Sequence, residues 1–445
     1  MAIPTRTLLR PTTCPHCWAK FEPQDILWIS SHSDLLGDPR LGPEQPQRFL
    51  PTRFNLQGYA LDSRGFVCQS LACPKCHLPV PRVLLETEPT FLSILGTPAC
   101  GKSFFLTALT WELRRLLPTH FGLSFADADT LSNRSLNEYE ESLFLNPKAD
   151  ELVPLADLIR KTELQGELYN TVMYGNQNVS YPRPFLFTVQ PLEHHPYAIQ
   201  APRVARVLCL YDNAGEHFLT GQDSTASPVT RHMARASILF YLFDPTQDPR
   251  FQKLIRQNKP ALAGAPSSRT SRQEVVLQEA AGRVRRVLGL SQGAKHTRPL
   301  IVVLTKYDVW AHLLPEADCA EPWVIKENLA GLDLERIENR SREVRALLLQ
   351  VSPELVAAAE GFAEEVIYVP TSALGESPTL GEQGKGLAIK PAAIKPIWAT
   401  VPFLYGMCRW MPGLIPSRKR RQGQDSSADG RGVAGRLQPL DGFAT

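Results

Sequence analysis

The sequence predicts an α/β protein, in which a doubly wound, mostly parallel sheet with helical insertions follows a small N-terminal domain. Apolar runs alternate with helix-like stretches between about residues 87 and 416, and these runs contain almost no alternating polar residues. Such continuous apolar strands are expected where helices cover both faces of a parallel sheet. The predicted strands are Phe91–Leu95, Pro184–Val189, Val204–Tyr211, Ile238–Phe243, Leu300–Leu304 and Val366–Val369.

Length and composition divide the chain into three parts. A chain of 445 residues is long enough for two or three domains. Residues 1–86 hold five of the nine cysteines, residues 87–416 hold the predicted sheet, and residues 417–445 form a polar, basic tail with too few apolar residues to fold. The formal net charge is only +3, which does not support nucleic acid as the main partner.

Apolar patterning argues against a secreted or membrane-spanning chain, so we predict a cytoplasmic protein. The N-terminus lacks the apolar core of a signal peptide, and about 18 consecutive apolar residues occur nowhere. The apolar segment 397–415 precedes the basic residues 418–421. We interpret it as the last helix of the domain, because Pro402, Pro412 and Arg409 oppose spanning, and a membrane-surface anchor is the alternative.

The first chemical motif follows the predicted strand at Phe91–Leu95. It reads GTPACGKS, from Gly96 to Ser103, and matches the pattern GxxxxGK[ST]. Small residues let backbone N–H groups surround a phosphate, while Lys102 can reach the β and γ oxygens and Ser103 can ligate Mg²⁺. The helix expected next adds its N-terminal dipole. This order of strand, loop and helix predicts a P-loop NTPase fold.

A second motif ends the predicted strand Val204–Tyr211. The sequence there is DNAG, from Asp212 to Gly215. A carboxylate at a strand end can hold the Mg²⁺ shell through water, and a glycine three residues later can offer its N–H to the γ-phosphate.

Two further strand ends predict the choice of base. The strand at 300–304 runs into Thr305-Lys306-Tyr307-Asp308, and the strand at 366–369 precedes Thr371-Ser372-Ala373-Leu374. In a guanine site, the Asp308 carboxylate accepts from N1–H and the 2-amino group, the Lys306 stem packs on the ring, and the backbone of Ser372 and Ala373 meets O6. Adenine lacks those two donors, so it would leave the carboxylate unpaired.

The four motifs in this order resemble those of TRAFAC-class GTPases. More narrowly, LACPKCH, GTPACGKSFFLTAL and LYDNAGEHF resemble bacterial GTPase-domain proteins of the double-GTPase type with an N-terminal zinc ribbon. Two positions depart from the class pattern. Thr305 replaces the usual asparagine, and Glu216 occupies the place of the glutamine of Ras-like members, with His217 beside it. A carboxylate near the γ-phosphate predicts slow hydrolysis, and His217 is the better candidate for orienting water.

The threonine that would complete the Mg²⁺ site is expected before the strand at 184–189. Thr162 and Thr171 both stand in that region, and we prefer Thr162. The acidic run at 126–145 is expected to be helical. Asp127 and Asp129 within it are interpreted as helix caps or solvated acids rather than as metal ligands.

Two CPxC motifs predict a structural zinc site. Cys14, Cys17, Cys73 and Cys76 supply four thiolates, two from each tight turn, with an inserted lobe between the two pairs. His16, His77 and Cys68 are assigned to the surface. A redox role for the first pair is the alternative.

Together these observations predict a slow Mg²⁺-dependent GTPase that acts as a switch with a protein partner. A non-hydrolysing scaffold, gated by nucleotide and interacting through its zinc ribbon, is the alternative. Lys102, Glu216 and His217 are the predicted catalytic residues. The residues assigned to GTP or GDP are Gly96, Gly101, Lys102, Ser103, Phe104, Thr162, Asp212, Gly215, Thr305, Lys306, Asp308, Ser372, Ala373 and Leu374.

Overall fold

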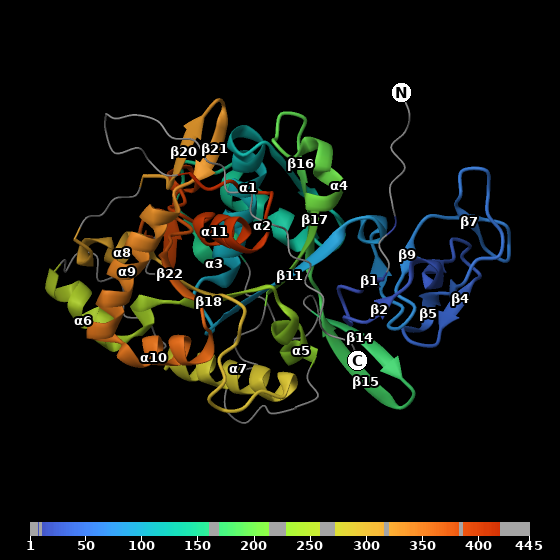
Figure 1. Cartoon of the computed structure of the whole chain (residues 1–445), viewed down its shortest axis with the longest axis horizontal. Helices are drawn as coiled ribbons and strands as arrows, with labels where there is room; N and C mark the ends of the chain where they lie inside the picture. The colour runs from blue at the N-terminus through green and yellow to red at the C-terminus, as the bar shows by residue number, and fades with distance from the viewer. Residues whose placement is uncertain are drawn as a thin grey trace, which may run out of the picture.

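A seven-stranded sheet lies at the centre of the computed structural model of the chain (Figure 1). The structure describes residues 8, 11–159, 169–212, 228–258, 272–315, 320–381 and 386–418. The strand order is β12-β16-β17-β11-β18-β19-β22. These strands are β11 Glu88–Gly96, β12 Leu123–Asp127, β16 Phe185–Pro191, β17 Arg206–Asp212, β18 Ile238–Phe243, β19 Leu300–Leu304 and β22 Val366–Pro370.

The sheet is mostly parallel, as predicted. β17, β11, β18, β19 and β22 pair in parallel, whereas β16 and β12 add antiparallel pairings at one edge. All six predicted strands belong to this sheet. The seventh strand, β12, was not predicted, and it includes the first two residues of the run at 126–145 that we expected to be helical. In that run the helix is confined to α2, Arg134–Phe144.

Helices cover both faces of the sheet, because successive strand residues point to opposite sides. In β18, Ile238, Phe240 and Leu242 face a core shared with α1 and α11, while Leu239 and Tyr241 face a core shared with α5, α6, α7 and α10. The described helices are α1 Lys102–His120, α2 Arg134–Phe144, α3 Leu155–Leu158, α4 Ala201–Val204, α5 Pro228–Arg235, α6 Pro249–Asn258, α7 Gln273–Leu288, α8 Tyr307–Trp310, α9 Leu334–Val351, α10 Pro353–Phe362 and α11 Val401–Trp410.

Short strands build an N-terminal module at the side of the sheet (Figure 1). Its largest sheet has the order β10-β9-β3-β6, and three hairpins accompany it. The strands of the module are β1 Thr12–Thr13, β2 Lys20–Phe21, β3 Leu27–Ile29, β4 Leu36–Asp38, β5 Gly42–Pro46, β6 Arg48–Phe49, β7 Ala60–Leu61, β8 Val67–Cys68, β9 Leu71–Ala72 and β10 Pro79–Val80.

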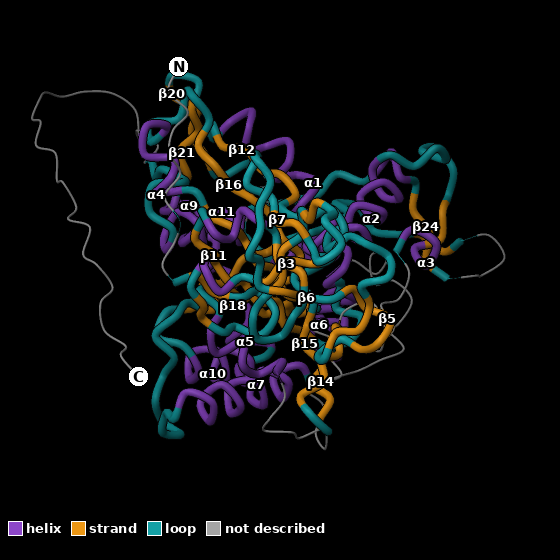
Figure 2. Tube along the Cα trace, turned by 90° about the vertical axis from the view of Figure 1, so that its right-hand side faces the viewer, coloured by secondary structure: helices purple, strands orange, loops and turns teal. Residues whose placement is uncertain are grey.

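Three smaller sheets complete the fold. The hairpin β14–β15 precedes β16, and the hairpin β20–β21 precedes α9. The sheet β13-β24-β23 and α3 form a lobe beside α2 (Figure 2). These strands are β13 Val153–Pro154, β14 Tyr169–Tyr174, β15 Gln177–Pro182, β20 Trp323–Lys326, β21 Leu329–Leu332, β23 Thr379–Leu380 and β24 Leu387–Ile389.

The apolar segment near the C-terminus belongs to the core. Within α11, Val401, Phe403, Leu404 and Met407 are at most 2% exposed. Their burial fits the interpretation as the last helix of the domain and leaves these side chains unavailable to a membrane surface. Among the described residues, no helix combines the length and apolarity needed to cross a membrane. The tail predicted from residue 417 falls outside the described residues from residue 419 onward.

Candidate functional site

The candidate site lies at the carboxyl edge of the parallel strands, where the end of β17 meets the loops after β11, β18, β19 and β22. Parallel pairing sets Ile94 beside Asp212, Gly96 beside Leu242, and Leu304 beside Pro370. The glycine-rich loop, Asp212 and the loops after β18, β19 and β22 therefore lie together in space. In open α/β sheets, ligands bind beyond the carboxyl ends of the strands.

Backbone geometry explains why two positions of the loop between β11 and α1 are glycine. A Cβ atom at Gly96 would lie 2.8 Å from the Leu242 oxygen and 2.8 Å from Cys100 Sγ, too close for any side chain. Gly101 has φ +94°, in the left-handed region that favours glycine. Helix α1 begins directly after it, and Phe105 N–H donates to the Gly101 oxygen at 2.8 Å.

Lys102 folds back onto this loop. Its Nζ donates to the carbonyl oxygens of Gly96 at 3.0 Å and Thr97 at 2.9 Å. Ser103 follows in the first turn of α1, and its carbonyl oxygen accepts from Thr107 Oγ1 at 2.8 Å. The loop thus concentrates an ammonium group, a hydroxyl group and the N-terminus of a 19-residue helix in one place.

Asp212 is the most unusual group at this edge. The residue is only 8% exposed, and among the described residues its Oδ1 has no hydrogen-bond partner. Burial raises the pKa of this carboxyl to about 6, although the charge of Lys102 opposes the shift. A buried carboxyl oxygen without a partner is costly, and a bound cation would relieve that cost.

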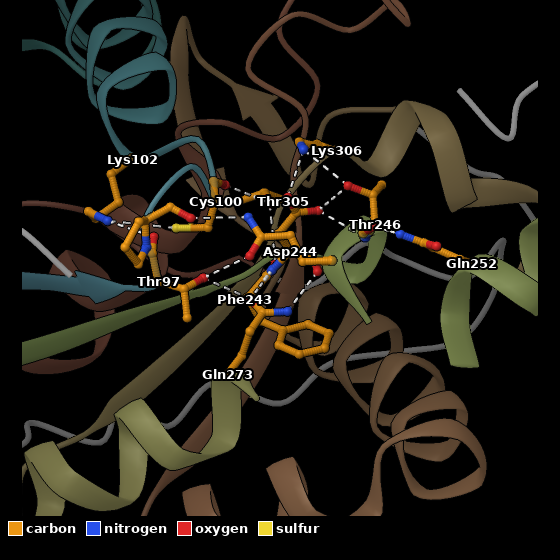
Figure 3. A network of polar contacts seen from close by, with 12 residues as sticks. Thr97, Cys100, Lys102, Phe243, Asp244, Thr246, Gln252, Gln273, Thr305 and Lys306 are labelled. Carbon is orange, nitrogen blue, oxygen red and sulfur yellow. Dashed lines mark hydrogen bonds and ion pairs between the residues drawn. The ribbon is translucent and has the colours of Figure 1, made fainter. Parts of the chain in front are cut away.

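Thr305 links the loop after β19 to the glycine-rich loop (Figure 3). Its Oγ1 lies 3.0 Å from the Cys100 oxygen and 3.3 Å from the Phe243 oxygen, either of which can accept its proton. Its backbone N–H donates to the same Phe243 oxygen at 2.9 Å. The threonine that departs from the class pattern therefore still connects the two loops.

Lys306 is held by the end of β18. Its Nζ lies 2.6 Å from Asp244 Oδ2 and donates to Thr246 Oγ1 at 3.0 Å (Figure 3). The Asp244 side chain is fully buried, so the ion pair fixes the lysine at the edge of the site. Sequence reasoning missed Asp244, although it follows a predicted strand directly, as Asp212 does.

Each carboxyl oxygen of Asp308 accepts a hydrogen bond from one serine hydroxyl. Ser372 Oγ donates to Oδ1 at 2.5 Å, and Ser377 Oγ donates to Oδ2 at 2.9 Å. The loop is tight here, because a Cβ at Gly375 would lie 1.7 Å from the Lys395 oxygen. The structure thus brings Asp308 and Ser372 together as predicted from sequence, and adds Ser377, which belongs to no motif.

Gln273, at the start of α7, contacts two loops and was also missed from sequence. Its Nε2 donates to the Asp244 oxygen at 2.8 Å, and its Oε1 accepts from Asp244 N–H at 2.9 Å and from Thr97 Oγ1 at 3.3 Å. These contacts connect the glycine-rich loop with the end of β18 across a long stretch of sequence. No local pattern marks a glutamine for this role.

Several predicted site residues lie apart from these contacts or outside the described residues. Phe104 and Leu374 pack against the small core of the α3 lobe, and Ala373 lies between Ser372 and Leu374 in the loop after β22. Thr171 is exposed on β14, with its Oγ1 3.4 Å from Ser180 Oγ. The predicted residues outside the described residues are Thr162, Gly215, Glu216 and His217.

Both acidic alternatives have structural partners. Asp127 pairs with Arg114 at 2.7 Å and accepts from Asn133 at 2.7 Å and Asn137 at 3.0 Å. Asp129 accepts from a backbone N–H and a hydroxyl group in the turn before α2. Asp127 is therefore neither a helix cap nor a solvated acid, because its side chain is only 15% exposed and is held by an arginine and two asparagines. Asp129 stabilises the turn before α2.

A four-cysteine cluster forms in the N-terminal module. The sulfur atoms of Cys14, Cys17, Cys73 and Cys76 all lie within 4.8 Å of one another. Cys14 and Cys76 sulfurs are 3.8 Å apart, and those of Cys17 and Cys73 are 3.7 Å apart. A tetrahedron with zinc–sulfur bonds of about 2.3 Å has edges of about 3.8 Å. The donor set therefore fits a metal such as zinc.

The two cysteine turns are built alike. His16 N–H donates to Cys14 Sγ at 3.3 Å, and Lys75 N–H donates to Cys73 Sγ at 3.4 Å. Burial raises the pKa of the Cys14 thiol, whereas the thiol of Cys14 and its neighbours lower the pKa of the Cys73 thiol. A bound metal would hold all four sulfurs as thiolates.

The surface assignment of three neighbouring residues is wrong. Cys68 is 0% exposed and His16 is 4% exposed, while His77 is half-buried. Each packs into the module with a partner of its own, so none joins the cluster. His16 Nε2 lies 2.9 Å from the Pro79 oxygen, His77 Nδ1 lies 2.8 Å from Asp38 Oδ2, and Cys68 Sγ lies 3.9 Å from Asp62 Oδ2.

Comparison with known proteins gives one full-length similarity. The chain is 24% identical over 427 residues to the putative ESX-1 scaffolding and assembly protein SaeC of Mycolicibacterium smegmatis. The match covers 88% of this chain and 98% of that protein. No protein-family model matches the sequence.

Metal analysis tests the cysteine cluster. Purified protein should contain about one zinc per chain, retained through mild washing, because four thiolates close the site. Replacing Cys14 and Cys73 with serine should abolish the metal, whereas Cys68→Ser should keep it. A metal-free, folded preparation with a disulfide between Cys14 and Cys17 would instead support the redox alternative.

The buried carboxyl predicts a pH effect on the nucleotide-free protein. In the folded protein Asp212 has a pKa of about 6, above its ordinary value near 4, so stability falls as pH rises between those values. Asp212→Asn should remove this loss and raise the free energy of unfolding at pH 7.5 by up to about 3 kcal/mol. Urea unfolding of both proteins between pH 4 and 7.5 measures the difference.

Asp127→Asn is the matched control, and its expected effect on the free energy of unfolding has the opposite sign. Burial raises the pKa of Asp127, but hydrogen bonds from Arg114, Asn133 and Asn137 outweigh it and lower the pKa. This variant should lose stability at neutral pH. If Asp212→Asn also lost stability there, the ionised Asp212 would have a stabilising partner in the folded protein.

Proposed function

We propose that the chain binds guanine nucleotide with Mg²⁺ at the carboxyl edge of the sheet, hydrolyses GTP slowly, and signals the bound state to a protein partner. The observation that carries the proposal is the buried Asp212 carboxyl, whose Oδ1 lacks a hydrogen-bond partner within the described residues. It lies beside Lys102 and the start of α1, where phosphate and metal ligands would be needed. This arrangement supports the P-loop interpretation of the motif at 96–103.

The part of the site that would bind the phosphates includes Lys102, whose ammonium group donates to carbonyl oxygens of the loop in this structure. Lys102 can leave the carbonyl oxygens of Gly96 and Thr97 for phosphate oxygens, because a flexible stem carries its charge. Ser103 and Asp212 are the residues that would hold Mg²⁺, which when bound neutralises charge on the β- and γ-phosphates. Backbone N–H groups of the loop and α1 would face the same phosphates.

The base end would use Asp308. Ser372 and Ser377 each occupy one lone pair of its carboxylate and orient it, which leaves further lone pairs for N1–H and the 2-amino group of guanine. Lys306, tied to Asp244, offers its stem to the ring. Adenine would leave Asp308 without those two donors, and such an unpaired carboxylate weakens binding strongly.

The rate of hydrolysis would depend on residues next to Gly215. Glu216 carries a negative charge near the expected γ-phosphate, which opposes attack by water, while His217 can orient the water. Both residues come from the sequence motif and lie outside the described residues. Slow intrinsic turnover, with a partner completing the catalytic apparatus, is the resulting expectation.

A second candidate is a nucleotide-gated scaffold that does not hydrolyse GTP. The full-length similarity to a protein named as a putative scaffolding and assembly protein favours this candidate. It also supports a protein partner under either candidate. Lys102→Ala should weaken nucleotide binding in both cases and cannot distinguish them.

Base selectivity tests the nucleotide assignment. Wild-type protein should bind GTP at least about a hundredfold more tightly than ATP, because only guanine satisfies Asp308. Asp308→Asn should shift preference toward xanthine nucleotides, as measured by titration calorimetry with Mg²⁺. Asp333→Asn, which alters only the cap of α9, should leave the preference unchanged. Equal affinity of wild-type protein for ATP would refute the guanine assignment.

Phosphate release distinguishes the enzyme from the scaffold. If the carboxylate near the γ-phosphate slows turnover, Glu216→Gln should raise the rate severalfold, and His217→Ala should lower it. A scaffold would release no phosphate in wild-type or variant protein. Fast wild-type turnover that is lost in Glu216→Gln would instead make Glu216 the base.

A further inference from the structure

The turn after the first cysteine pair packs directly on the central sheet. Trp18 follows Cys17, is only 2% exposed, and donates from Nε1 to Tyr211 Oη at 3.0 Å. The Tyr211 hydroxyl in turn donates to the Pro15 oxygen. Burial raises the pKa of Tyr211, so its hydroxyl keeps the proton that this bond needs. Two buried hydrogen bonds thus join the cysteine turn to β17.

The same turn also contacts α5. The His232 ring stacks on Tyr211 with centroids 4.7 Å apart and planes 19° apart, and it lies 5.9 Å from the Trp18 ring. Arg235 Nη1 donates to the Trp18 carbonyl oxygen at 3.1 Å. Trp18 therefore contacts two elements of the central domain, β17 and α5, at once.

The cysteine pair determines where Trp18 lies. Trp18 has φ +57°, a left-handed conformation that a bulky residue rarely adopts. The turn holds it there, because Trp18 N–H donates to the Cys14 oxygen at 3.1 Å and Cys14 N–H donates to the Ala19 oxygen at 3.0 Å. His77 occupies the same place after the second pair, with φ +62°. A metal that fixes the four sulfurs would therefore fix the Trp18 ring.

The contact lies one peptide bond from Asp212, the proposed Mg²⁺ ligand. Tyr211 directly precedes Asp212 at the end of β17, and α5 begins at Pro228. The proposed function assigns Asp212 to the Mg²⁺ that neutralises charge on the β- and γ-phosphates. The cysteine module thus holds in place the residue next to Asp212.

We infer that Trp18 and Tyr211 are positioning residues, through which the metal-loaded cysteine cluster sets the affinity for nucleoside triphosphate over diphosphate. The inference rests on the proposed function, because it concerns the same Asp212 site. Binding of the diphosphate depends mainly on the loop at 96–103. The coupling therefore changes chiefly the affinity for the triphosphate. By thermodynamic reciprocity, bound triphosphate also raises the affinity of the cysteine cluster for its metal.

Two conservative variants test the coupling. Trp18→Phe and Tyr211→Phe keep an aromatic ring and remove the hydrogen bond between them. Each should retain about one zinc and near wild-type affinity for GDP, but lose about tenfold in affinity for a non-hydrolysable GTP analogue. The matched control is Trp28→Phe, because the Trp28 ring contacts Phe54 inside the module, 6.2 Å away. It should leave both affinities unchanged.

The rate of zinc extraction from wild-type protein tests the same coupling without any variant. A zinc-selective chelator should extract the metal several times more slowly from protein loaded with the GTP analogue and excess Mg²⁺ than from protein loaded with GDP. Equal extraction rates would overturn the inference, as would a uniform loss of GDP and triphosphate affinity in the two variants. Failure of wild-type protein to bind either nucleotide would instead refute the proposed function.

Discussion

The parallel pairing of β11 with β17 on one side and β18 on the other is the constraint on which the candidate site depends. It sets Asp212 level with Ile94 and brings Leu242 against Gly96, so closely that only glycine fits there. A shift of one residue would exchange the two faces of β11 and move every loop at this edge. The alternation of Leu92, Ile94 and Leu95 between two separate cores resists such a shift.

Among the described residues, most polar side chains at this edge have protein partners, and the Asp212 carboxyl differs. Asp244, Asp308 and Lys306 are satisfied by hydroxyls, backbone groups or each other, which keeps the loops after β18, β19 and β22 in fixed relation. Asp212 differs, because its buried Oδ1 is left without a partner among the described residues. The contrast distinguishes the rigid frame of the site from the place where a ligand would complete it.

The central sheet was predictable because its strands are continuous apolar runs, which only a sheet buried on both faces requires. β12 was not predicted because it is a short antiparallel edge strand, in which Ser124 and Asp127 interrupt the apolar run. The four cysteines were predictable from their spacing, and the cluster is present. Ser377, Asp244 and Gln273 were not, because their roles come from contacts between loops far apart in sequence. The burial of His16 and Cys68 likewise depends on how the module packs.

The contact between Trp18 and Tyr211 also bears on the order in which the chain folds. The two residues are 193 positions apart, and Tyr211, Val207 and Cys209 of β17 complete the core of the cysteine module. At about 5–20 residues per second, synthesis leaves roughly 10–40 s between the emergence of Trp18 and that of its partner. During this time the side of the module that β17 later covers stays exposed, and uncovered apolar surface of this kind favours aggregation. Docking onto β17 ends that exposure and couples maturation of the module to completion of the sheet.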